Sequence, residues 1–351
     1  MQNEIRRDYL LERYAIIAAE RARRPTDFAV KSSERDSNKD CPFCIGNELM
    51  TPPADLVYLP SDGGVVREKD SNEFRQKGWT IRCFPNLYPA LSPDAKALTP
   101  DGQKLNMKRP AYGYHEIVVE SPNHDGHPHK ARLKQLGFVL DACLELSEKF
   151  YSDPNIQYVQ IFRNHKKEAG ASLSHAHTQI IATPLVPSIV KDEFDKSKMY
   201  FEEEGECVFC RMIADEKKGA RLIYEGESFV VIAPWASVHP FEFWFLPESH
   251  ESDLINVTDL EKQDFTKTLR ISLGGLASIL NDPPYNYGFH VGPKSDRCNE
   301  YYHWHLEVYP KLSTWAGFEL CTGMYLNVMP PETAAESLRG VLNAELGSLT
   351  I

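Results

Sequence analysis

The chain has 351 residues and a formal net charge of −11, because 50 aspartates and glutamates outnumber 39 lysines and arginines. This acidic balance argues against a general surface for nucleic acid or anionic membranes. No apolar run approaches the roughly 20 residues of a transmembrane helix, and residues 1–8 contain no apolar signal core, so the cytoplasm is the expected compartment. The length favours two domains, or one large unit built by duplication.

Hydrophobic periodicity and turn residues predict a mixture of short strands and long helices along the chain. Segment 183–206 is expected only to connect the two halves, with prolines at its start and an acidic run near its end. In chain order we expect a hairpin or strand at 8–19, loops at 29–40 and 92–109, a strand at 114–120, a helix at 133–150, a strand at 158–162, a strand at 242–250, a helix at 260–280 and an amphipathic helix from 331 onward.

The most distinctive stretch is residues 170–179, which read GASLSHAHTQ. On an extended strand His175 and His177 point to the same face, because side chains alternate with a period of two. The small residues from Ala169 to Ser172 form a loop whose backbone N–H groups can approach an anion closely. This combination suits one histidine as a metal ligand and the other as a nucleophile toward phosphorus.

Four of the eight cysteines form two C-x-x-C pairs, Cys41 with Cys44 and Cys207 with Cys210. Such a pair is either a redox motif or half of a zinc site. No βαβ pattern surrounds either pair, which disfavours the redox interpretation.

Five features recur in the same order in both halves of the chain: a C-x-x-C pair, a strand that ends in a histidine, a helix, a D-P-x-x-x-Y turn and an H-x-H pair. The spacing from Glu116 to His124 equals that from Glu242 to His250, since 124 − 116 = 250 − 242 = 8. The sequence therefore predicts an internal duplication with halves at residues 1–185 and 186–351, paired about a pseudo-twofold axis.

Each half offers two thiols and two imidazoles, a set that suits tetrahedral, structural zinc. We expect two zinc ions per chain. His124 is preferred over His127 and His129 as a ligand because it matches the register of the second half. The predicted ligands are Cys41, Cys44, His124 and His175 in the first half and Cys207, Cys210, His250 and His303 in the second.

These motifs together resemble the galactose-1-phosphate uridylyltransferase branch of the histidine-triad superfamily. The resemblance covers nearly the whole chain and includes RARRP at 21–25, FPNLYPA at 84–90, SPNH at 121–124 and GFE at 317–319. It implies an α+β fold in which two histidine-triad-like halves form an antiparallel half-barrel with outer helices, usually as a homodimer.

The resemblance also implies a chemistry, namely ping-pong nucleotidyl transfer through a nucleotidylated His177. A backbone carbonyl on the other ring nitrogen would hold the required tautomer. Gln179 and Ser172 would hold the phosphates, and Gly170 and Ala171 would allow close backbone approach. The remaining substrate-binding positions implied by the family are Arg21 and Arg24, which otherwise form a solvated basic turn, together with Asn86, Asn164 and Asn327.

The second half departs from this pattern, because Glu307 stands where the first half has Gln179 and no GAS loop precedes its H-x-H pair. An anion would meet a carboxylate there, so the second half is expected to be structural. Some family members place iron in this region, but Cys207 and Cys210 favour zinc.

The substrates implied by the resemblance are a nucleoside diphosphate hexose and an acceptor, either hexose 1-phosphate or inorganic phosphate. Uridylyl transfer between hexose phosphates is the leading interpretation. The HAHTQ motif and the segment Leu320–Asn327 also resemble the ADP-glucose phosphorylase branch, so adenylyl transfer to phosphate stays open. A third hypothesis is a non-catalytic, zinc-stabilised nucleotide-binding protein.

Overall fold

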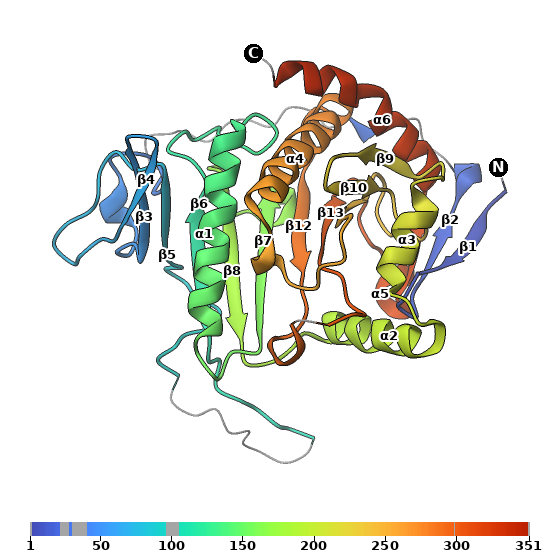
Figure 1. The fold of residues 1–351 in the computed structure, drawn as a ribbon, viewed down its shortest axis with the longest axis horizontal. Helices are drawn as coiled ribbons and strands as arrows, with labels where there is room; N and C mark the ends of the chain where they lie inside the picture. The colour runs from blue at the N-terminus through green and yellow to red at the C-terminus, as the bar shows by residue number, and fades with distance from the viewer. Residues whose placement is uncertain (1, 22–27, 30–40, 96–104, 298, 350–351) are drawn as a thin grey trace.

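The computed structural model describes residues 2–21, 28–29, 41–95, 105–297 and 299–349. Its centre is an eleven-stranded sheet with the strand order β4-β3-β5-β6-β8-β7-β12-β13-β11-β10-β9 (Figure 1). Every neighbouring pair in this sheet is antiparallel. Three further strands form a small separate sheet in the order β1-β2-β14, in which β14 runs parallel to β2.

The elements have the following bounds. The strands are β1 (Glu4–Arg7), β2 (Tyr14–Ile17), β3 (Leu56–Ser61), β4 (Gly64–Glu68), β5 (Ile81–Pro85), β6 (Tyr114–Val119), β7 (Tyr158–His165), β8 (His177–Thr183), β9 (Leu222–Glu225), β10 (Phe229–Ile232), β11 (Phe243–Pro247), β12 (Tyr285–His290), β13 (His305–Pro310) and β14 (Met324–Asn327). The helices are α1 (Leu133–Tyr151), α2 (Ser188–Glu204), α3 (Val208–Glu216), α4 (Asp259–Leu280), α5 (Gly317–Thr322) and α6 (Pro331–Ser348).

The two halves of the chain meet in the middle of the sheet, where β7 pairs with β12 from Tyr285 opposite His165 to Gly288 opposite Phe162. The β6-β8-β7 unit of the first half is repeated as β11-β13-β12 in the second. The structure thus confirms the α+β class. The predicted boundary at residue 185 falls just before α2 and stays a prediction.

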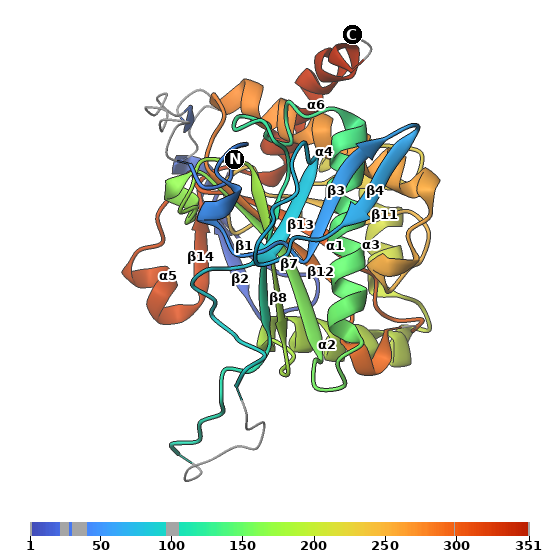
Figure 2. The same cartoon turned by 90° about the vertical axis from the view of Figure 1, so that its left-hand side faces the viewer.

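Helices α1 and α4 cover one face of the sheet, and the largest apolar core lies between these helices and the sheet. Ile180 and Ala182 of β8, Leu140 of α1 and Leu276 of α4 are all buried in this core. Since side chains alternate along a strand, His177 and Gln179 point to the opposite face. Figure 2 shows α5 and β14 on that opposite side, away from α1. The helices therefore form a rigid backing that leaves the histidine face open to other segments.

Most predicted elements are present, and the differences are local. Residues 188–204 form helix α2 rather than a simple connection. Strand β8 begins at His177, so His175 lies in the bend before the strand. Among the described helices, none has the length and apolarity needed to cross a membrane.

Sheet register corrects the alignment of the two halves. Ile117 lies opposite Gln179 in one half, and Trp244 lies opposite Glu307 in the other. Glu242 therefore occupies the sheet position of His115, not that of Glu116 as equal spacing suggests. The reason is that the loop between this strand and the metal-site histidine is one residue shorter in the second half.

The D-P-x-x-x-Y match is also displaced in register. Tyr158 lies opposite Thr183, six residues after His177, whereas Tyr287 lies opposite Val308, three residues after His305. The motif marks the same helix-to-strand turn in both halves, but its tyrosines do not occupy equivalent sheet positions.

Candidate active site and metal centres

His177 lies at the wall of a pocket of about 390 Å³ on the open face of the sheet. Gln179, Ser172 and Asn86 line the same pocket. The structure therefore brings together four residues that lie between positions 86 and 179 of the chain. Apolar side chains supply much of the remaining wall, including Phe43, Met50, Phe84, Leu87, Tyr88, Ile117 and Leu173.

The tautomer of His177 is set by its neighbour. Its Nδ1 lies 2.8 Å from the backbone carbonyl oxygen of His175, so Nδ1 carries the proton and donates it to that carbonyl. Nε2 then keeps its lone pair. Burial lowers the pKa of His177, and the hydrogen bond to the His175 carbonyl offsets this in part. A neutral imidazole with a free Nε2 is the nucleophilic form, and the structure supplies the carbonyl that the sequence led us to expect.

The loop before β8 contains a left-handed glycine and is tied to the second half of the chain. Gly170 has φ of 92°, in the left-handed region that favours glycine. The loop is tied to the second half of the sheet by Asn286, whose Nδ2 donates to Asn164 Oδ1 at 2.8 Å and to the carbonyl of Ala169 at 2.7 Å. Asn164 thus acts on the loop only through Asn286, and Ala171 is buried at the end of the loop.

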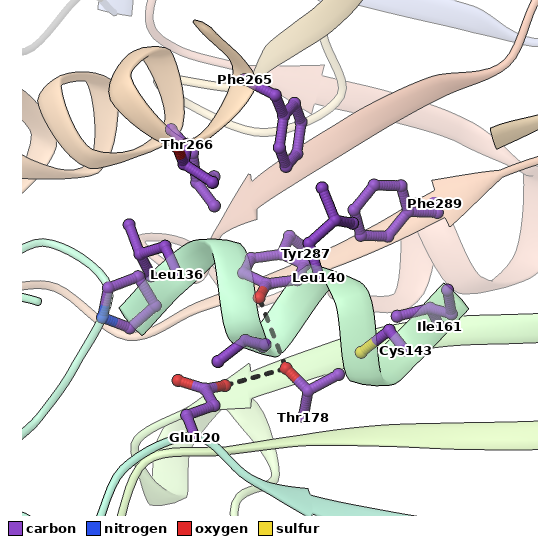
Figure 3. Close-up of a pocket in the computed structure, with 13 residues that line it drawn as sticks. Glu120, Leu136, Leu140, Cys143, Ile161, Thr178, Phe265, Thr266, Tyr287 and Phe289 are labelled. Atoms are coloured by element: carbon purple, nitrogen blue, oxygen red, sulfur yellow. Dashed lines mark hydrogen bonds between the residues drawn. The ribbon is translucent and has the colours of Figure 1, made fainter. Parts of the chain in front are cut away.

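Behind β8, on the helix-covered face, a buried ion pair between Glu120 and Arg163 supports the strand. Figure 3 shows Glu120 and its hydrogen bond to Thr178. Glu120 Oε1 accepts hydrogen bonds from Thr178 Oγ1 and from Arg163 Nε, both at 2.8 Å. The adjoining cavity measures only about 20 Å³, enough for a single water. Because Thr178 follows His177 directly, this pair fixes the strand from the side opposite the pocket.

The first metal centre unites the four predicted side chains. Cys44 Sγ lies 3.3 Å from His124 Nδ1 and 3.5 Å from His175 Nδ1, and Cys41 Sγ lies 3.7 Å from His175 Nδ1. In a tetrahedral zinc site the sulfur and nitrogen ligands are about 3.5 Å apart, given Zn–S and Zn–N bonds of about 2.3 and 2.0 Å. The donor set therefore fits zinc.

The outer contacts of these imidazoles support the same assignment. His175 Nε2 donates to the carbonyl of Ser121 at 2.8 Å, and His124 Nε2 lies 2.9 Å from Ser174 Oγ. The first of these bonds leaves the His175 Nδ1 lone pair facing the thiols, as a metal ligand requires. Phe43, between the two cysteines, lies edge-on to His177 with ring centroids 5.4 Å apart. The metal loop therefore forms part of the pocket wall.

The second centre repeats the arrangement. Cys210 Sγ lies 3.4 Å from His250 Nδ1 and 3.8 Å from His303 Nδ1, and His250 Nε2 donates to the Asn299 carbonyl at 3.0 Å. Within each of the two clusters all the ligand atoms lie within 4.8 Å of one another. The structure brings the histidine predicted in each half, His124 and His250, to its cysteine pair, and His127 and His129 lie outside the first cluster.

A third cluster was missed from the sequence. Glu193, His290, His305 and Glu307 place one ligand-type atom each within 4.8 Å of the others. His290 Nδ1 lies 2.9 Å from Glu193 Oε2, and its Nε2 lies 3.6 Å from Glu307 Oε2. These carboxylates raise the pKa of His290 to about 9 against the opposing effect of burial, so the cluster is an ion-paired network. In the sequence only His305 and Glu307 stood out, because they belong to the second H-x-H motif. Glu193 lies in helix α2, which we expected to be only a connection.

Among the described residues, the predicted substrate residue Asn327 does not line the pocket. Asn327 is buried in β14, where its Nδ2 donates to the carbonyls of Ser237 and His239 and its Oδ1 accepts from the N–H of Met329. Arg24 lies outside the described residues, and so does the side chain of Arg21.

A duplicated antiparallel sheet with two thiol–imidazole clusters, and a pocket beside a histidine and a small-residue loop, has the features expected of a nucleotidyltransferase. Two family models match the chain: galactose-1-phosphate uridyl transferase, N-terminal domain, over residues 1–187, and its C-terminal domain over residues 158–346. The chain belongs to the galactose-1-phosphate uridylyltransferase family, which confirms the resemblance read from its motifs.

Two curated relatives span nearly the whole chain. ADP-glucose phosphorylase of Arabidopsis thaliana is 36% identical over 343 residues, covering 96% of this chain and 93% of the relative. Galactose-1-phosphate uridylyltransferase of Thermotoga maritima is 26% identical over 344 residues, covering 96% and 98%.

Solved structures agree. The crystal structure of the Arabidopsis thaliana ADP-glucose phosphorylase with bound ADP-glucose aligns with a TM-score of 0.78 at 32% identity, covering 96% of this chain and 98% of that one. A uridylyltransferase structure aligns with a TM-score of 0.73 at 28% identity, covering 97% and 99%. Both the fold and its near-complete extent are therefore shared with nucleotidyltransferases of this family.

Proposed function

We propose that the protein transfers a nucleotidyl group from a nucleoside diphosphate hexose through a covalent intermediate on His177. The carrying observation is the His177 ring, whose Nδ1–H is bound to the His175 carbonyl and whose Nε2 is free at the wall of the pocket. The activities named for the two relatives support this proposal.

In the first step, His177 Nε2 attacks the α-phosphorus, and the bond between that phosphorus and the bridging oxygen breaks. The electron pair leaves with the hexose 1-phosphate. In the second step an oxygen of the acceptor attacks the same phosphorus and releases the neutral imidazole. Splitting one displacement into two in this way gives ping-pong kinetics.

The choice of base and acceptor separates two candidates. The 36% identity with an ADP-glucose phosphorylase, against 26% with a uridylyltransferase, favours ADP-glucose as donor and phosphate as acceptor. Uridylyl transfer from UDP-glucose to a hexose 1-phosphate is the second candidate, and the family model supports it.

The two candidates are separated by parallel incubation with ADP-glucose and UDP-glucose, each labelled at the α-phosphate. Acid-labile label on His177 is the expected result, and the donor that labels faster identifies the base. Discharge of that label by phosphate or by galactose 1-phosphate identifies the acceptor. Absence of label with both donors would overturn the proposal.

We further propose two structural zinc ions per chain, because both thiol–imidazole clusters have suitable donors and spacing. The first ion would hold His175, whose carbonyl in turn fixes His177. A homodimer is also proposed. It is supported by exposed apolar side chains at the mouth of the pocket, where Tyr88 is 85% and Leu87 58% exposed. Light scattering of the purified protein tests this assembly.

A further inference from the structure

His115, on β6, is not part of any motif that indicated function, yet it contacts both amide side chains of the pocket. Its Nε2 lies 2.9 Å from Gln179 Oε1 and 3.2 Å from Asn86 Nδ2. Its Nδ1 lies 3.1 Å from the backbone nitrogen of Ala90. The contact with Gln179 decides which way the amide of Gln179 faces.

The backbone contact fixes the tautomer of His115. The Ala90 N–H can only donate, so Nδ1 must carry a lone pair, and in the neutral ring the proton then resides on Nε2. Nε2–H donates to Gln179 Oε1. The amide oxygen of Gln179 therefore faces His115, and its amide nitrogen points away from His115. No described residue accepts a hydrogen bond from that nitrogen.

Asn86 is oriented independently. Its Oδ1 accepts from the backbone N–H of Tyr88 at 3.0 Å, so its Nδ2 is the atom that lies beside His115 Nε2. Two N–H donors facing each other form no hydrogen bond. The protons of Asn86 Nδ2 are therefore available to an acceptor in the pocket, where both Asn86 and Gln179 are lining residues.

We propose that His115 is a positioning residue that turns the amide nitrogen of Gln179 toward the phosphate oxygens of the substrate, beside the independently oriented amide of Asn86. This rests on the proposed function, because the acceptor it requires is the anionic phosphate group that His177 attacks. Donors oriented before the substrate arrives stabilise developing charge without further reorganisation. In the second half of the chain, the same sheet position holds Glu242, and Glu307 replaces Gln179. An imidazole–amide pair thus occurs only where the pocket is proposed to be catalytic.

The test compares three substitutions of His115 in the full chain. His115→Gln places an amide nitrogen at about the reach of Nε2 and can still donate to Gln179. His115→Asn is too short to reach Gln179, and His115→Phe keeps the ring without any donor. We expect the Asn and Phe variants to slow single-turnover labelling of His177 about 10- to 100-fold, with little change in KM, and the Gln variant to recover most of that loss.

The variant results are read against wild-type labelling. If the wild type takes no label from ADP-glucose or UDP-glucose, the proposed function fails. If the wild type is labelled and all three variants are labelled as fast as the wild type, or differ from it only in affinity for the donor, the role of His115 fails and the proposed function stands. Side-chain ¹⁵N NMR provides a readout besides activity: the Nε2–H tautomer is expected, and an Nδ1–H tautomer would overturn the inference.

Discussion

The two H-x-H sites of this chain have the same backbone plan and opposite surroundings. In both, the second histidine donates Nδ1–H to the carbonyl of the first, at 2.8 Å for His177 and 3.1 Å for His305. In both, a phenylalanine between two metal-site cysteines packs on the ring, Phe43 at 5.4 Å and Phe209 at 5.0 Å. The backbone carbonyl and the phenylalanine of the C-x-x-C loop thus orient an imidazole in a similar way in each half.

The difference lies in what faces the free nitrogen. His177 faces a pocket with Gln179 and Asn86, whose amides can donate. His305 Nε2 lies 3.3 Å from Glu307 Oε1, and the rings of Trp244 and His290 lie 5.4 and 4.9 Å from its own. The two halves therefore share a scaffold and differ in the neighbours of the second histidine, which are amides in the first half and carboxylates in the second.

The largest difference is expected between substitution of His177 and substitution of its counterpart His305. His177→Asn should reduce nucleotidyl labelling and turnover on the order of 10⁴-fold or more, because the covalent step is lost. The matched substitution His305→Asn should leave labelling close to the wild-type rate. Mass spectrometry of labelled peptides and steady-state rates measure both, with zinc content as the check on folding. Equal losses in the two variants would show that the halves are not functionally distinct.

The metal sites should differ in their influence on activity. Cys44→Ser and Cys210→Ser should each lower the zinc content by one ion per chain and lower the melting temperature, since structural zinc contributes directly to folding free energy. Only Cys44→Ser should also slow labelling of His177, by about tenfold, because His175 and Phe43 shape the pocket. Elemental analysis combined with single-turnover labelling tests this. An equal slowing by Cys210→Ser would contradict the assignment.

Much of this comparison was readable from the sequence, because the motifs act locally. The spacing of two thiols and the alternation of a strand were enough to predict that His124, His175, His250 and His303 lie with the cysteine pairs, and that His177 lies beside the GAS loop. The order of repeated features predicted the duplication. Each of these inferences depends on residues within a few positions of one another.

What the sequence did not reveal depends on contacts between distant segments. The role inferred for His115 depends on the N–H of Ala90 and on pairing between β6 and β8, and neither leaves a spacing signal. The carboxylate of Glu193 reaches His290 from a helix 97 positions earlier in the chain. Asn327 matched a family stretch, but tertiary packing satisfies its amide elsewhere. Equal spacing also misaligned Glu116 with Glu242, because loop length changed between the halves.

That pair of glutamates gives a stability test. Burial raises the pKa of Glu116 to about 8 and that of Glu242 to about 7. Each stays protonated in the folded state above its ordinary pKa, so its stabilising contribution is complete below that value and is lost as the pH rises through the folded-state value. The wild type should lose up to about 1.4 kcal/mol per pH unit for each group, from about pH 5 to 8 for Glu116 and from about pH 5 to 7 for Glu242.

The two glutamates differ in how well their oxygens are satisfied. Glu116 Oε1 is buried without a hydrogen-bond partner, so Glu116→Gln should flatten the pH dependence and stabilise the protein near pH 8. Glu242 accepts hydrogen bonds from the N–H groups of Val238 and His239 and from Trp244 Nε1. In Glu242→Gln the amide NH₂ would face one of these N–H donors, so the substitution should cost about 1–3 kcal/mol of stability. Urea unfolding from pH 6 to 9 in excess zinc measures both. A steeper pH dependence in Glu116→Gln would refute the assigned direction.

The smallest effect on labelling is expected from Glu307→Gln, which tests why we expect no nucleotidyl transfer at His305. Glu307→Gln restores an H-x-H-x-Q motif in the second half, but the aromatic rings around His305 and the GAS-free approach to its strand remain. We expect labelling to stay at one nucleotide per chain, on His177 alone, because removing one carboxylate creates neither a pocket nor an anion loop. Peptide mapping after exhaustive labelling decides the point, with Gln179→Glu as the reciprocal variant that should slow labelling of His177 by placing a carboxylate at the phosphate. A second label on His305 would mean that one charge, and not packing, separates the two halves.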